Sequence, residues 1–208
     1  MSVDEDASPV VAAAAGLLAE RPYTEVALED VADAAGLTVD DVVARVGDLH
    51  AVAAAVLTVE GASMRAAMAS ARERSDDPLD VLVTTFRLVG ENMASRVEVR
   101  AGMRLAAESH RHFPERRIDP YRTWRAFVVA QLTEAEARGR LRPGVDVDEV
   151  AWLLVSAGMG TKGLLEFRDA WDEAGRRLGG VATTVLGLVA VSARHGGSRE
   201  AATPSEPA

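Results

Sequence analysis

Apolar residues near the N-terminus recur at helical spacing in three short segments. The first, 9–21, is rich in Ala, Val and Leu. The second, 28–35, has apolar residues at i, i+3, i+4 and i+7, and Gly36 follows it where a helix commonly ends in a left-handed residue. Thr38 is suited to cap a third helix, 39–46. This pattern predicts three short helices, with the layout of a helix-turn-helix between Leu28 and His50.

The remainder of the chain carries longer amphipathic or mostly apolar runs separated by polar, Pro-containing and Gly-containing breaks. No segment shows the alternating pattern of a half-buried strand. The sequence therefore predicts an all-α protein of about nine helices. The six longer helices are expected at about 49–74, 78–96, 97–111, 120–139, 147–165 and 168–194.

Composition excludes several classes of protein. The chain has no cysteine, so disulfides, thiolate nucleophiles and Cys-ligated metals are excluded. Hydrophobic residues make up 48% and charged residues 26%, which is ordinary for a soluble domain. No apolar run has the length of a membrane span, and the acidic N-terminus lacks the order of a signal peptide. We therefore expect a cytoplasmic protein with no membrane partner.

The net charge of −9 is unevenly distributed. Residues 1–50 contain eleven acids and two bases, Arg21 and Arg45, whereas the remaining 158 residues contain 21 of each. The whole acidic excess therefore lies in the segment with the helix-turn-helix pattern. Because DNA binding depends on Lys and Arg displacing counterions, this charge opposes association with DNA.

Three short helices followed by a long fourth, with Ala-Ala-Gly at the turn, resemble the TetR family of bacterial regulators. The resemblance covers about residues 9–60. It is carried by Leu17 and Leu18, Tyr23, Asp30-Val31-Ala32, Ala34-Ala35-Gly36-Leu37-Thr38, Gly47 and Ala51-Val52. It implies a homodimer in which each C-terminal domain encloses a ligand chamber and the last two helices form a four-helix bundle.

The C-terminal part is similar to the γ-butyrolactone-receptor branch of that family. The similarity is carried by Val99–Leu105, Asp119-Pro120-Tyr121 with Trp124, Gly139–Asp146 and Leu154–Gly160. By this analogy Trp124 would line the chamber. The implied organisation is an acidic, disordered tail at 1–8, a helix-turn-helix domain at 9–50, a ligand-binding and dimerisation domain at 51–195, and a disordered tail at 196–208.

The sequence departs from the family pattern where DNA would be contacted. Ala27 replaces a usual hydroxyl residue, Val43 a usual Tyr, Val46 a usual aromatic residue, and Leu49 a common Lys. The remaining candidates for DNA contact are Thr38, Val39, Asp40, Asp41 and Arg45. A carboxylate can accept a hydrogen bond from cytosine, but Asp40 and Asp41 also suit the first turn of a helix. We expect DNA binding to be weakened or lost.

The expected chamber is apolar, with methionines, an aromatic wall and one or two polar groups, and would bind a small hydrophobic or amphipathic ligand. For each single residue, burial in an ordinary core is the alternative. The candidates are Met103, Leu105, Glu108, Trp124, Phe127, Val128, Leu154 and Met159.

Candidate catalytic groups are few. Glu108, His110 and His112 lie close in sequence, but on a helix residues 108 and 112 share a face that residue 110 does not, so a three-ligand metal site is not expected. No known catalytic motif occurs, and no cofactor is expected. Glu108 is the one candidate acid or base.

Small and apolar residues give the last helix a face for close packing. They are Val181, Val185, Leu188 and Ser192, with Gly179, Gly180, Thr184 and Gly187 between them. Together with the helix around Trp152–Gly163 this face could form the dimer bundle, or it could be buried within one subunit.

Three functions stay open at this point. The first is a ligand-responsive transcriptional regulator. The second is a receptor that no longer reads DNA and instead sequesters ligand or pairs with a true regulator. The third is an enzyme that uses the chamber.

Overall fold

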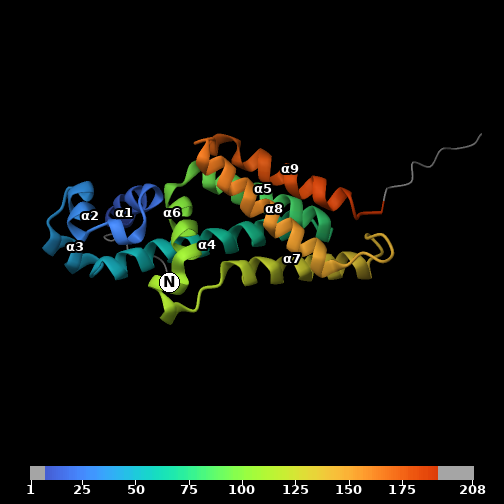
Figure 1. Cartoon of the computed structure of the whole chain (residues 1–208), viewed down its shortest axis with the longest axis horizontal. Coiled ribbons are helices and arrows are strands. Elements are labelled where there is room, and N and C mark those ends of the chain that lie inside the picture. Colours follow the sequence, from blue (N-terminus) through green and yellow to red (C-terminus); the bar gives the residue numbers. More distant parts are fainter. Residues whose placement is uncertain (1–7, 192–208) are drawn as a thin grey trace, which may run out of the picture.

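The computed structural model describes residues 8–191, which form nine α-helices and three short 3-10 turns. Figure 1 shows α1, α2 and α3 together at one end, with α4 running from them toward a body made by α5, α7, α8 and α9. Within the described residues the only extended pairing is an isolated bridge between Leu141 and Ala190, so the fold is all-α, as predicted.

The first three helices, α1 (Ser8–Glu20), α2 (Leu28–Ala35) and α3 (Val39–Arg45), follow the predicted segments to within one residue. A 3-10 turn, η2 (Tyr23–Glu25), lies between α1 and α2. Gly36 ends α2 with φ of 67°, a backbone conformation that costs glycine little. The turn thus places α3 against α2 in the predicted helix-turn-helix.

Helix α4 (Leu49–Arg74) contributes side chains to both hydrophobic cores. Its N-terminal half, including Val52 and Val56, packs with α1, α2 and α3, and its C-terminal half, including Met64 and Ala71, packs into the larger body. By length and composition α4 could cross a membrane. Because its apolar side chains pack into these two cores, α4 is a core helix in this fold.

The larger body begins with α5 (Pro78–Ser95). Among the helices that follow, α7 is capped by Asp119 and α8 by Asp146. Their bounds are α6 (Val97–His112), η3 (Pro114–Arg116), α7 (Pro120–Ala137), α8 (Val147–Phe167), η4 (Trp171–Glu173) and α9 (Ala174–Gly187).

The last helix differs from the single helix predicted at 168–194. Helix α8 continues to Phe167, and the chain then turns through Asp169, whose φ is 48°. Helix α9 begins only at Ala174 and ends at Gly187, after which the chain turns to bridge Leu141. The sequence placed a helix boundary near residue 166, but the apolar periodicity continues through residues 168–173 and past Gly187, so the pattern did not give the observed bounds of α9.

Both predicted tails lie largely outside the described residues. Of the predicted tail 1–8 only Ser8 is described, and it opens α1. The predicted tail 196–208, together with Ser192 of the predicted helix face, falls outside the described range.

An aromatic cluster joins the C-terminal end of α6 to the N-terminal helices. The Phe113 ring lies 4.7 Å from the His50 ring and 5.3 Å from the Tyr23 ring, measured between centroids. His50 Nε2 also lies 3.0 Å from a carboxylate oxygen of Glu115 in η3. Helix α6 is therefore fixed to the helix-turn-helix end as well as to the body.

Candidate functional site

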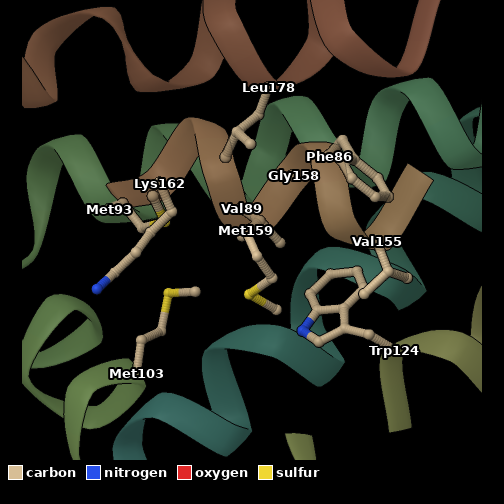
Figure 2. A pocket seen from close by; sticks show the side chains of 10 residues that line it. All are labelled: Phe86, Val89, Met93, Met103, Trp124, Val155, Gly158, Met159, Lys162 and Leu178. Carbon is tan, nitrogen blue, oxygen red and sulfur yellow. The ribbon is translucent and has the colours of Figure 1, made fainter. Parts of the chain in front are cut away.

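A small cavity lies in the larger body among α5, α6, α7, α8 and α9 (Figure 2). Its volume is about 30 Å³, room for about two water molecules. Three of its lining residues are methionines, whose flexible side chains can rearrange around a larger molecule. The lining residues are Phe86, Val89, Met93, Met103, Trp124, Val155, Gly158, Met159, Lys162 and Leu178.

Trp124 of α7 forms the aromatic wall of this cavity. Its ring lies edge-on to Phe86 at 5.7 Å and to Phe127 at 6.1 Å, both between centroids. A Cβ on Gly158 would stand 2.9 Å from the edge of the Phe86 ring, so glycine allows α8 to approach this wall closely. In Figure 2 the indole nitrogen points toward Met159 and the cavity, where it can donate a hydrogen bond.

Lys162 of α8 supplies the one charged group of the lining. Its side chain is 19% exposed, and its Nζ lies 2.7 Å from Glu166 Oε2, one helical turn on. Figure 2 shows its amine at the side of the cavity away from Trp124. The cavity thus has two hydrogen-bond donors at separated positions within an apolar lining.

A second, wider groove of about 390 Å³ lies on the other side of Trp124, between α4, α6 and the start of α7. Glu60 of α4 lines it, and burial raises the pKa of this carboxyl to about 7, opposed by the nearby Arg65. Arg116, Arg117 and Arg122 line the same groove. Its character is polar and cationic, unlike that of the cavity.

Helix α3, the second helix of the helix-turn-helix, has Asp41 engaged in a cap with Thr38. The Thr38 hydroxyl accepts a hydrogen bond from the Asp41 amide at 3.1 Å, and the Asp41 carboxylate accepts one from the Thr38 amide at 3.2 Å. The Thr38 hydroxyl also donates a hydrogen bond to Asp41 Oδ2 at 2.6 Å, and this bond, followed by the one from the Thr38 amide, lowers the pKa of Asp41. Val39 packs against the N-terminal core. Asp40, Val43 and Arg45 are left exposed.

Positive charge is scarce around this helix. Within residues 8–50, Arg21 pairs with Asp30 at 3.1 Å, which leaves Arg45 as the one arginine there outside an ion pair. Two arginines of α4 do not add to this surface. Arg65 lies in the groove beside Glu60, and the Arg72 guanidinium stacks 5.2 Å from the Phe127 ring centroid in the body.

The model of the tetracycline repressor-like C-terminal domain family matches residues 78–190, more than half of the chain. The chain belongs to the TetR family. The matched segment holds α5, the cavity and the outer helices α8 and α9, while the helix-turn-helix precedes it in the order expected of TetR-like regulators.

Solved structures share the fold over nearly the whole chain. CprB, a TetR-family protein from S. coelicolor A3(2), is 22% identical with a TM-score of 0.74, and the match covers 91% of each chain. A γ-butyrolactone receptor described as ArpA-like is 20% identical with a TM-score of 0.68, covering 90% of this chain and 100% of that one.

A third structure comes from work on the control of antibiotic production by bacterial hormones. It is 23% identical with a TM-score of 0.73, and the match covers 92% of this chain and 100% of that one. At these identities the likeness shows a shared TetR fold. No curated protein matches the chain.

Three of the eight predicted chamber residues, Met103, Trp124 and Met159, line the cavity. The other five lie outside its lining. Phe127 packs edge-on behind Trp124, and Val128 and Leu154 are fully buried in the main core. Leu105 belongs to the N-terminal core, because α6 turns this face toward α1 and α4. Whether the lining residues bind a ligand stays a prediction.

Glu108 lies on α6 outside the cavity lining, half exposed, with its Oε2 3.9 Å from His112 Nε2. His112 in turn stacks on Tyr23, and His110 is exposed on a different face. Among residues 8–191 no group of three or more His, Asp or Glu side chains could hold a metal ion. The geometry thus gives Glu108 no position from which to act on a molecule in the cavity.

Pattern reasoning missed the α5 and α9 walls of the cavity and its lysine. Phe86, Val89 and Met93 have the same helical spacing as ordinary core residues, so no signal separates them from the rest of α5. Lys162 did carry a signal, because it is the sole lysine of the chain and stands in a run of small and apolar residues.

The outer faces of α8 and α9 carry exposed apolar side chains beside glycines. Phe167 is 89% exposed, Trp152 66% and Leu164 65%, and Leu188 just after α9 is 62% exposed. A Cβ on Gly160, Gly163, Gly180 or Gly187 would meet no atom within 4 Å, so these glycines face open space.

The inner face of α9 instead packs within the subunit. Gly175 and Gly179 lie against Glu91 and Arg87 of α5, and Val185 is buried. Of the residues predicted for the dimer face, Gly179 thus faces α5, Val181 and Val185 pack with the main core, and Gly180, Thr184, Gly187 and Leu188 are exposed.

Proposed function

We propose that this TetR-family chain is a homodimeric, small-molecule-responsive regulator whose contact with DNA is weakened. The observation that carries the proposal is the apolar cavity beside Trp124, placed in a body that α4 and α6 join to the helix-turn-helix. A small hydrophobic or amphipathic molecule suits this lining. Among proteins of the same fold are structures described as γ-butyrolactone receptors.

The weakened DNA contact is supported by the surface of α3. Its exposed side chains include one free carboxylate, Asp40, and one arginine, Arg45, while Asp41 is held in the helix cap. Phosphate contacts supply most of the affinity for DNA, and each needs a donor or a cation. A domain with this surface would hold DNA loosely at physiological salt.

The same acidic excess favours a second function, a receptor that binds ligand without reading DNA. Such a protein would sequester the ligand or pair with a DNA-binding partner. Both functions use the cavity, and both would take place in the cytoplasm. They differ only in whether the helix-turn-helix contacts DNA.

The dimer is proposed to form through the outward faces of α8 and α9. Phe167, Leu164 and Trp152 lie along one side of α8, and the outward glycines of both helices allow a second copy to approach closely. Two such helix pairs related by a two-fold axis would make a four-helix bundle. Burial of these side chains removes apolar surface that a monomer would leave in water.

A fluorescence-polarisation titration with the promoter DNA of its own gene, run from low to physiological salt, tests the proposal. Weak binding that disappears as salt rises supports a loosened DNA contact. Tight, sequence-specific binding at physiological salt would show that the acidic domain reads DNA normally. No binding at any salt favours the receptor that does not read DNA.

A further inference from the structure

The charges beside the cavity do not balance. Lys162 pairs with Glu166 at 2.7 Å, and Arg104 of α6 lies 4.0 Å from the other oxygen of the same carboxylate. This group of three side chains therefore has two cations and one anion. A second anion at the cavity edge would neutralise it.

From this arrangement we infer that the chamber recognises an apolar monocarboxylate, with Lys162 as the residue that binds the carboxylate. The inference rests on the proposed function of the cavity as a ligand chamber. The apolar part of the molecule would lie among Met93, Met103 and Met159. Its carboxylate would accept a hydrogen bond from the Lys162 ammonium group. Both donors of the lining, the Lys162 ammonium and the Trp124 N–H, suit an acceptor, and neither suits a cation.

The pair that the ligand would replace is weakly held. Glu166 is 40% exposed, so water and salt screen its attraction to Lys162. The Lys162 side chain is largely buried, so a carboxylate delivered inside the cavity would meet it in a less polar setting, where the same contact is stronger. The ligand carboxylate would thus bind Lys162 more strongly than Glu166 does.

Release of Glu166 has a consequence for the contact between the body and α1. Arg104 Nη1, the atom that lies 4.0 Å from Glu166, also donates a hydrogen bond to the carbonyl oxygen of Ala19 at 3.0 Å, near the C-terminal end of α1. A Glu166 carboxylate freed from Lys162 would draw Arg104 toward itself and away from Ala19. Ligand binding would thereby loosen a bond between the body and the helix-turn-helix domain.

The binding step is tested by isothermal titration of the full chain with hexanoate, and with methyl hexanoate and hexylamine as matched probes. Hexanoate should bind tightest and hexylamine not at all. Lys162→Gln should weaken hexanoate roughly tenfold or more, because a charge-assisted hydrogen bond is lost, and should leave the neutral ester unchanged. Lys162→Arg should retain hexanoate binding within a few-fold.

Glu166→Gln should have the opposite effect on hexanoate affinity. Because this substitution removes the competing carboxylate, hexanoate should bind more tightly to the variant than to the parent protein. A protein whose Lys162 serves only as structure would show no such opposed pair of effects. Since Lys162 is the only lysine, its rate of acetylation, read by mass spectrometry against the N-terminal amine, gives a second measure. Hexanoate should protect it and hexylamine should not.

The expected loosening of the Arg104–Ala19 hydrogen bond is measured by hydrogen exchange of the backbone amides of residues 17–23. Hexanoate should speed exchange there in the parent protein and should not do so in Glu166→Gln, which still binds the probe. If hexanoate leaves exchange in the parent protein unchanged, ligand binding does not loosen this bond.

Other outcomes separate the inference from the proposed function. Equal binding of hexanoate and its methyl ester, unaffected by Lys162→Gln, would overturn the carboxylate site while leaving an apolar chamber in place. No binding of either probe would overturn both.

Discussion

Gly102 of α6 crosses α4 directly against Glu60, so that a Cβ on the glycine would stand 2.2 Å from the Cβ of Glu60 and 3.3 Å from the carbonyl oxygen of Val56. This contact sets the distance between the two helices that take part in both cores. It also helps to bury the Glu60 carboxyl, and burial raises the pKa of that group to about 7.

Gly102→Ala should destabilise the protein by about 2 kcal/mol, because neither Cβ can move without a shift of the backbone. For a chain of this size the expected fall in Tm is roughly 5 °C. Thermal unfolding followed by circular dichroism measures it. Gly16→Ala in α1, where an added Cβ meets no atom within 4 Å, should instead leave Tm unchanged or raise it. Equal Tm values for the two variants would contradict the close crossing.

Glu60 should make stability fall as pH rises. Its pKa in the folded protein, about 7, exceeds the ordinary value of 4.5, so the folded state holds the proton more tightly than the unfolded state does. The stabilising effect of that proton is present below about pH 4.5 and is lost as pH passes through 7. Glu60→Gln should therefore raise stability at pH 8 by roughly 1–3 kcal/mol relative to the parent, and little at pH 4.5.

Urea unfolding at both pH values measures this difference. Glu136→Gln, an exposed position on α7, is the matched control and should show no such pH dependence. A parallel shift of both variants at both pH values would rule out Glu60 as the source.

Leu178→Ala should enlarge the cavity. Leu178 is 4% exposed and lines the cavity from α9, so truncation should cost roughly 2–4 kcal/mol and create apolar space for a small probe such as benzene. Benzene should then raise the Tm of this variant. Leu132→Ala, in the fully buried core of α7 outside the cavity lining, should lose similar stability but gain less from benzene. If benzene raised the Tm of Leu132→Ala more than that of Leu178→Ala, the space open to the probe would lie outside this cavity.

Asp40→Lys should increase affinity for DNA, and Asp41→Asn should not. Asp40 is exposed and outside the helix cap, so the substitution removes a repulsion and adds a possible phosphate contact. The slope of log affinity against log salt should steepen by about one. Asp41→Asn instead disturbs the cap with Thr38 and should lower stability by about 1 kcal/mol. Polarisation titrations at several salt concentrations compare the two variants.

Phe167→Asp should separate the proposed dimer. The side chain is 89% exposed in the single chain, and a carboxylate there would be buried without a partner in a four-helix bundle. Sedimentation velocity should show a shift toward monomer over micromolar concentrations. Val43→Asp, an exposed apolar position on α3, should leave the oligomeric state as it is. If both variants sediment identically, the dimer interface does not include this face of α8.

The sequence predicted the helices well because their ends are encoded locally. Gly36, Thr38 and Asp48 fix the turns around α3 through caps and left-handed backbone, and each is visible in a few neighbouring residues. The boundary between α8 and α9 was expected near residue 166, whereas α8 ends at Phe167 and α9 begins only at Ala174, because Arg168–Ala170 carry no Pro or Gly to interrupt the apolar period. Tertiary packing of Trp171 and Ala174, rather than local preference, shapes that segment.

The cavity was predicted less completely, for a similar reason. Trp124 was found from its family position, but a cavity is defined by what side chains of distant helices leave unfilled. Leu105 and Met103 are two residues apart on α6 and enter different cores, a distinction that depends on how α6 is rotated between α1 and α8. Helical periodicity cannot supply that rotation.

The aromatic contact of Phe113 with Tyr23 and His50 bears on how the molecule can be divided. Phe113 is 1% exposed and completes the core of the first three helices from a position more than sixty residues downstream in the chain. A fragment that stopped at residue 50 would lack this ring and the buried part of α4, and would expose the surface they cover. We therefore expect the N-terminal end to melt together with the body, as one cooperative unit, and not to survive as an excised peptide.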